Sequence, residues 1–146
     1  MSKKSRQKQR FWLLIAFIIV GYGASLYTPP TTNEPAPQQS ADQLYEQQKS
    51  NNQLEVSGEV IKLLTDDHVG KRHQRFIIKL ETGLSLLIAH NIDLADRIDS
   101  LKEGDIVTVY GEYEWNEHGG VLHWTHHDPK KRHVDGWIKH QGTTYQ

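Results

Sequence analysis

The chain has 146 residues, with 17 Lys and Arg, 18 Asp and Glu, nine His and no Cys. This length allows one ordinary domain with little left over. The absence of cysteine excludes disulfides, thiolate metal sites and cysteine nucleophiles. The formal net charge of −1 excludes a generally basic protein that coats nucleic acid.

The N-terminal end has the pattern of a membrane anchor. Residues 1–10 form a basic flank with five Lys and Arg and no acid, and residues 11–27 follow without a charge. A membrane-spanning helix needs roughly 17–25 apolar residues, and a basic flank stays in the cytoplasm. We therefore expect a single-pass helix in a bacterial inner membrane, with the rest of the chain in the periplasm or another extracytoplasmic space. The alternative is a signal segment, uncleaved or cleaved near Gly23-Ala24-Ser25.

Residues 28–53 are rich in proline and glutamine and contain four of the five prolines. They include too few apolar side chains to offset the entropy cost of ordering, so we expect a disordered stalk. A short helical turn from Ala41 to Lys49 is compatible with this composition. The folded domain is then expected to cover residues 54–146.

Residues 54–146 have the pattern of a small β protein, because apolar and polar residues alternate in short runs between turn residues. We expect strands at 54–64, 75–80, 84–90, 105–115 and 120–126, a short helix at 91–101, and a final hairpin at 136–145 that turns at Gln141-Gly142. Three strands, a short helix and two strands is the order of an OB-like five-stranded barrel. The domain is therefore expected to be all-β with one short helix. Another small barrel or a meander is the alternative.

The segment HWTHHDP, residues 123–129, places three histidines and an aspartate directly after an expected strand. Strand side chains alternate between the two faces of a sheet. Leu122 and Trp124 have the character of buried residues, which puts His123 and His127 on the outer face.

The neighbouring strand offers carboxylates on the same face. We expect the strands at 105–115 and 120–126 to pair so that their polar sides lie on the same outer face. This register puts Glu114 opposite His123, and it puts His126 on the inner face opposite Gly111. Directly opposite side chains lie about 4.5–5.5 Å apart at Cβ, which is close enough to share a metal or a proton. The outer face then has a polar patch that holds Glu112, Glu114, His123 and His127.

The candidate ligands of a divalent transition metal are Glu114, His123, His127 and His133. Two imidazoles four positions apart on a strand are about 13 Å apart. His123 therefore needs a bend in the strand or a ligand from elsewhere, such as His133 or His90. The alternative is a polar surface whose histidines make ordinary hydrogen bonds.

The loop TDDHVGKRHQR, residues 65–75, is a second candidate for function. In OB-folds the loops between strands 1 and 2 and between strands 4 and 5 flank the ligand groove. The first of these carries Lys71, Arg72, His73 and Arg75, and the second carries His118; arginine and histidine there suit phosphate or carboxylate groups. The alternative is an ordinary solvated loop.

From residue 54 onward the chain has eleven Lys and Arg against fifteen Asp and Glu, so nucleic acid is not favoured as a partner.

The strings KRHQRFI, LLIAHNIDLADRI, VYGEYEWNEHGGVLHWTHHDP and HVDGWIKHQGTTYQ resemble a family of short bacterial proteins known as domain of unknown function 3465. The resemblance covers Val56 to Gln146 and leaves the anchor and the stalk outside. Its pattern runs through residues 73–76, 89–91 and 123–129, which favours a site there. The ligand-binding residues implied are His90, Asn91, His126 and Asp128, in addition to those of the loop. The resemblance implies no activity.

We expect a membrane-tethered binding module for an anionic envelope ligand or a protein partner. One alternative is a metal-dependent, nuclease-like hydrolase that uses the His and Asp cluster, with Arg75 stabilising an anionic transition state. Another is an envelope protein whose histidines only respond to pH. The sequence does not decide whether the protein is an enzyme.

Overall fold

The computed structural model describes residues 39–146. The expected basic flank, the membrane segment and residues 28–38 of the stalk lie outside the described residues. Within residues 39–146, no helix combines the length and the apolar character needed to cross a membrane.

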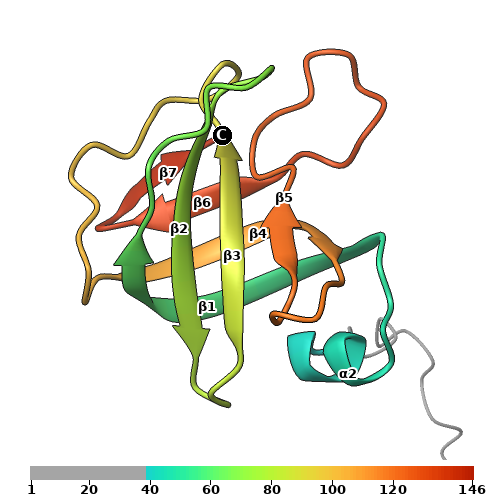
Figure 1. Ribbon diagram of the computed structural model, residues 1–146. Helices are drawn as coiled ribbons and strands as arrows, with labels where there is room; N and C mark the ends of the chain where they lie inside the picture. The colour runs from blue at the N-terminus through green and yellow to red at the C-terminus, as the bar shows by residue number, and fades with distance from the viewer. Residues whose placement is uncertain (1–38) are drawn as a thin grey trace, which may run out of the picture. The chain divides into compact units, whose positions relative to one another are not determined.

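The described residues confirm a mostly β domain with one short helix (Figure 1). Alternating apolar residues form the strands, and glycines or prolines separate most of them. The elements are α2 (Ala41–Glu46), β1 (Asn52–Leu63), β2 (His73–Leu80), β3 (Ser85–Asn91), β4 (Ile106–Glu114), β5 (Val121–His123), β6 (Trp137–His140) and β7 (Thr143–Tyr145).

Five of these strands close into a barrel of mixed pairing. Their order is β1-β2-β3-β5-β4, and β4 pairs back onto β1. The β3–β5 pair is parallel, whereas β1–β2, β2–β3, β4–β5 and β1–β4 are antiparallel. Strands β6 and β7 extend from β4 outside the barrel. They confirm the expected hairpin, whose turn has φ of 48° at Gln141 and 81° at Gly142.

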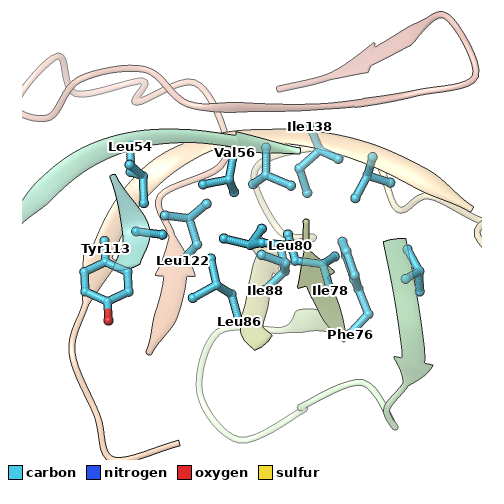
Figure 2. Packing of buried hydrophobic residues seen from close by; sticks show 14 of the residues in the cluster. Leu54, Val56, Phe76, Ile78, Leu80, Leu86, Ile88, Tyr113, Leu122 and Ile138 are labelled. Atoms are coloured by element: carbon cyan, nitrogen blue, oxygen red, sulfur yellow. The ribbon is translucent and has the colours of Figure 1, made fainter. Parts of the chain in front are cut away.

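Alternate residues of the strands fill the barrel interior (Figure 2). The fully buried apolar side chains include Val60, Phe76, Ile78, Leu86, Ile88, Val109, Tyr113, Leu122 and Ile138, each 0% exposed. Burial of this apolar surface is the main force that stabilises the fold. The residues between them in each strand point outward and are half-buried or exposed, so each strand also contributes to an outer face.

The predicted helix at 91–101 is wrong, because the structure has a series of turns there. The side chain of Gln74 in β2 accepts the N–H of Ile98 at 2.9 Å and donates to its carbonyl oxygen at 3.0 Å. A side chain therefore satisfies backbone groups that a helix would have paired internally. The Asn91 side chain accepts the N–H of Asp93 and starts a turn instead of capping a helix.

Residues 39–53 are ordered, so the predicted disordered stalk is wrong there, whereas the short helical turn expected as compatible with Ala41 to Lys49 is present as α2. Helix α2 begins with a capping box, in which the side chains of Ser40 and Gln43 each accept the backbone N–H of the other. Ala41 and Leu44 are 3% and 1% exposed and belong to the hydrophobic core. Two apolar residues at helical spacing thus hold a segment that is polar in overall composition. The folded unit therefore includes α2.

Candidate functional site

The pairing of β4 with β5 decides which polar side chains face one another. Glu112 lies opposite His123, and Glu114 lies opposite Val121. The predicted pairing of Glu114 with His123 is therefore wrong by two residues. The loop is longer than expected because the Asn116 side chain accepts two backbone N–H groups of the turn. A two-residue shift keeps the same face, so both acids and His123 still share the outer face.

The segment after β5 does not continue the alternation. Trp124 has a φ of 53°, a left-handed conformation that is uncommon for a bulky residue, and the strand ends before it. Trp124 is therefore half-buried instead of lying in the core. The methyl group of Thr125 occupies the space beside Gly111, where His126 had been predicted. His126 is nevertheless buried, at 3% exposed.

Four side chains converge on the outer face at the end of β5. One ligand atom from each of Glu112, Glu114 and His123 lies within 4.8 Å of the other two. His133 joins from the following loop, with its Nε2 2.7 Å from Oε2 of Glu112. The His123 Nε2 atom is buried without a hydrogen-bond partner and lies 3.7 Å from Oε1 of Glu112. These four residues form the carboxylate–imidazole cluster.

His133 presents Nε2 to the cluster because its other ring nitrogen is held. Nδ1 donates to the carbonyl oxygen of Val134 at 2.8 Å. The ring of Trp124 stacks on the imidazole, with centroids 4.2 Å apart and planes 6° apart. Burial lowers the pKa of His133, but the Val134 hydrogen bond and the Glu112 carboxylate outweigh burial and raise it. For His123 burial dominates and lowers the pKa despite the nearby carboxylates.

Asp128 holds the loop that delivers His133. Its carboxylate accepts the backbone N–H groups of Lys130 at 2.9 Å, Arg132 at 2.7 Å and His133 at 3.0 Å. The hydrogen bonds from Lys130 and Arg132 are the main reason that the pKa of Asp128 is lowered. Both carboxylate oxygens of this predicted ligand-binding residue are thus engaged in positioning the loop.

His127 lies apart from the cluster. Its side chain is 53% exposed, and its Nδ1 donates to Oδ2 of Asp135 at 2.8 Å. Asp135 also accepts the backbone N–H of Asp128 at 2.8 Å. Of the four predicted metal ligands, the structure brings together Glu114, His123 and His133 and leaves out His127.

His90 and His126, two predicted ligand-binding residues, are both buried. His90 is 0% exposed, and its Nε2 donates to the carbonyl oxygen of Asp96 at 3.2 Å. Its Nδ1 then accepts from the hydroxyl of Thr125 at 2.8 Å. Burial lowers the pKa of His90 to about 4, so the ring is neutral at pH 7. The Nδ1 of His126 donates to the carbonyl oxygen of His127 at 2.8 Å.

The two arginines predicted to bind a ligand contact protein groups, Arg72 in the turns after β3 and Arg75 in its own loop. Arg72 Nε lies 2.7 Å from Oδ1 of Asp93, and its backbone N–H donates to the same carboxylate. The Arg75 guanidinium donates to the carbonyl oxygen of Thr65 from two nitrogens, at 3.2 and 2.9 Å. These contacts fix both cations along the loop.

Two cavities adjoin Trp124, next to the cluster. The smaller, of about 130 Å³, is lined by His73, Asn91, His123 and His126. The larger, of about 210 Å³, is bordered by the loop of residues 128–132. The two share Lys71, Asn91 and Trp124. The predicted residues His73, Asn91 and His126 thus lie beside the cluster, whereas Arg72 and Arg75 line neither cavity.

Three residues at this face were not anticipated as site residues: Trp124, Lys130 and Arg132. Trp124 continues the apolar alternation after Leu122, and nothing in the sequence indicates its left-handed φ. The run of three cations at 130–132 was an available signal, but its position beside the barrel depends on the loop that Asp128 holds.

Comparison with known proteins gives a family but no activity. No curated protein matches the chain. The model of the family described as protein of unknown function (DUF3465) matches residues 25–146. The match begins before the stalk, so it includes residues 28–53, which the resemblance in sequence had left outside. The chain therefore belongs to the DUF3465 family of proteins of unknown function.

Proposed function

We propose that the barrel is an OB-like domain. The order β1-β2-β3-β5-β4, the closure of β4 onto β1 and the parallel β3–β5 pair support this assignment. OB-folds bind ligands across the outer face of strands 2 and 3 and at the adjoining loops. His73 of β2 and Asn91 of β3 line the smaller cavity with His123, which is consistent with use of that face.

We propose that the domain is a binding module whose carboxylate–imidazole cluster holds one divalent transition-metal ion. The observation that carries this proposal is the convergence of Glu112, Glu114 and His123, whose ligand atoms lie within 4.8 Å of one another. Small side-chain rotations would bring these atoms to a common ion at about 2.0–2.2 Å. His133 supplies a fourth donor from the adjoining loop.

The donor set suits zinc. Two imidazole nitrogens and two carboxylates are borderline and hard ligands, and four of them match the tetrahedral preference of Zn²⁺. The Nδ1–H of His133 is fixed on a backbone carbonyl, the usual support for a histidine that coordinates through Nε2. A bound ion would also give the buried Nε2 of His123 a partner.

Charge favours a cation at the same place. Glu112 and Glu114 lie two residues apart on one face of β4, so their carboxylates repel each other unless a positive charge lies between them. In the absence of an ion, protonated His133 supplies that charge. This metal-free network is the second candidate function, a pH-sensitive surface, and the raised pKa of His133 favours it.

Metal content decides between the two. The full chain, purified without a His tag, is incubated with zinc, separated from free ion by gel filtration and measured by plasma mass spectrometry. We expect close to one zinc per chain, with loss of zinc in His123→Ala and in Glu114→Gln. His118→Ala is the matched control, because this side chain is 85% exposed and outside the cluster, and it should retain zinc.

His127→Ala sharpens the same experiment. The sequence predicted His127 as a ligand, whereas its contact with Asp135 places it outside the cluster, so this variant should also retain zinc. The metal proposal fails if the wild-type chain retains none of zinc, nickel, cobalt or manganese. It fails equally if His123→Ala binds as much zinc as the wild type.

A separate proposal concerns the location of the domain. We propose that residues 11–27 anchor the chain in the inner membrane and leave the barrel in the periplasm or another extracytoplasmic space. The uncharged run at 11–27 and the basic flank before it support this orientation. Fractionation of cells that express the full chain, followed by protease treatment of spheroplasts, tests both points.

A further inference from the structure

We propose that the larger cavity beside Trp124 is a second, separate site that binds the phosphate group of a small organic phosphate. This cavity has a volume of about 210 Å³. None of the four residues of the carboxylate–imidazole cluster lines it, so the proposal goes beyond the metal site and does not depend on it.

Cations border this cavity from two directions. Lys71 comes from the loop before β2, and Lys130 and Arg132 come from the loop after β5. Among residues 39–146, none of these three side chains makes an ion pair. All three are exposed, so their charges are available to a ligand that enters from solvent.

The two carboxylates that line the same cavity are already compensated. Asp93 receives the backbone N–H of Arg72 at 2.8 Å and its guanidinium at 2.7 Å. Asp128 accepts three backbone N–H groups of its own loop. Because Arg72 neutralises Asp93 from outside the cavity, the three lining cations oppose one remaining acid, Asp128, and a net positive charge remains at the cavity. This local excess contrasts with the acidic balance of the sequence from residue 54 onward.

The charge pattern favours a small anion over a polymer. A long polyanion is bound through many cations spread over a surface, whereas a small anion needs only a few, such as the three cations that line this cavity. A phosphate monoester carries close to two negative charges at neutral pH, which matches the net charge of the cavity. Arginine and lysine are the usual donors to such a group.

The remaining walls suit an organic substituent. Trp124, Leu94 and Pro129 provide apolar surface beside the cations. At about 30 Å³ for each water in the liquid, the cavity has the volume of roughly seven waters, which is more than a single ion needs. The smaller cavity shares Lys71, Asn91 and Trp124 with it and is also lined by His123. A bound phosphate ester would therefore lie next to the cluster.

Calorimetric titration of the full chain with inorganic phosphate and with phenyl phosphate tests the proposal, with acetate as the non-phosphate anion. We expect phenyl phosphate to bind more tightly than phosphate, and acetate to bind most weakly. Arg132→Gln and Lys71→Gln should each weaken phenyl phosphate binding about tenfold, as expected for the loss of a charge-assisted hydrogen bond.

Lys131→Gln is the matched control. Lys131 is an exposed cation between Lys130 and Arg132 but does not line the cavity, so phenyl phosphate affinity should change less than about twofold. Thermal unfolding of each variant verifies that it is folded. Absence of binding to both phosphates overturns the proposal, as does a loss in Lys131→Gln equal to that in Arg132→Gln.

The titrations are run on chelator-treated and on zinc-loaded protein, which separates the two proposals. Phenyl phosphate binding to the chelator-treated chain supports the anion site even if no metal is retained. Binding that requires zinc and is unaffected by Arg132→Gln overturns it, because the ligand would then be held by the ion alone. Zinc retention by a chain that binds no phosphate leaves the metal proposal standing and removes this one.

Discussion

Two regions of this barrel place histidines in opposite chemical environments. In the interior, both ring nitrogens of His90 have partners, the Thr125 hydroxyl and the Asp96 carbonyl, and the ring is neutral. On the outer face, Nε2 of His123 has no partner, and Nε2 of His133 meets a carboxylate. Both regions depend on the same short segment at the end of β5. Thr125 of this segment contacts His90 in the interior, and His123 belongs to the cluster on the outer face.

This difference shows that a histidine-rich motif does not define a site by composition. A ring nitrogen is available to a ligand only where the fold leaves its lone pair without a hydrogen bond or sets it against carboxylates. The interior histidine instead makes an ordinary buried polar contact, whose value lies in stability. The two regions should therefore respond differently to substitution, to pH and to the loop that connects them.

The largest expected effect is on stability, from the interior region. His90→Ala removes two hydrogen bonds and leaves a cavity between β3 and the segment after β5. We expect the free energy of unfolding to fall by about 3 kcal/mol. Urea unfolding of the full chain, followed by circular dichroism in the presence of chelator, measures it. His118→Ala on the surface should change it by less than about 0.5 kcal/mol, and an equal effect of both would contradict the comparison.

Acid should act on the same region. Because burial lowers the pKa of His90 to about 4, the fold favours the neutral ring. The unfolded chain binds a proton near pH 6.5, so this contribution to stability is present above pH 6.5 and is lost as the pH falls toward 4. The loss amounts to roughly 3 kcal/mol at 1.36 kcal/mol per pKa unit. His90→Gln does not titrate, so the stability advantage of the wild type over it should shrink between pH 6.5 and 4.

The measurement is the unfolding midpoint of both proteins in urea at intervals across that range. A constant difference between wild type and His90→Gln would mean that His90 keeps an ordinary pKa. The interior region would then be no drier than the surface, and the distinction between the two regions would be lost.

The barrel could be predicted from the sequence because its strands alternate strictly and its turns contain glycine. The errors arose where a long-range contact overrode a local pattern. Residues 91–101 have helical spacing of apolar residues, but Gln74 takes the backbone groups of Ile98. The helical turn at α2 was allowed for but assigned to the stalk, because only two of its residues, Ala41 and Leu44, enter the core.

The candidate site could be predicted in part. The alternation of side chains along each strand predicted that Glu112, Glu114 and His123 share one face. The predicted register was wrong by two residues, which leaves each side chain on the same face. His127 was included wrongly among its neighbours because the alternation was extended past Trp124, where the left-handed backbone ends it. His133 lies ten residues after His123, in the loop that Asp128 holds. The alternation of residues in a strand does not predict where such a loop comes back to the barrel.

The smallest expected effect is on zinc affinity and comes from the loop that carries His133. Asp128→Ala leaves the backbone N–H groups of Lys130, Arg132 and His133 without their acceptor. His133 is then held less firmly beside Glu112, while every proposed metal ligand is retained. Loss of support around a metal ligand costs about 10–100-fold in affinity, and we expect the lower end for zinc.

Competition for zinc with a chromophoric chelator measures this change in affinity. Asp99→Ala is the control, because that carboxylate is 85% exposed and pairs only with Arg97 in the described part of the chain. Unchanged zinc affinity in Asp128→Ala would mean that the ion is held by β4 and β5 alone. His133 would then not be a metal ligand. The site on the outer face would consist of Glu112, Glu114 and His123, which converge without it.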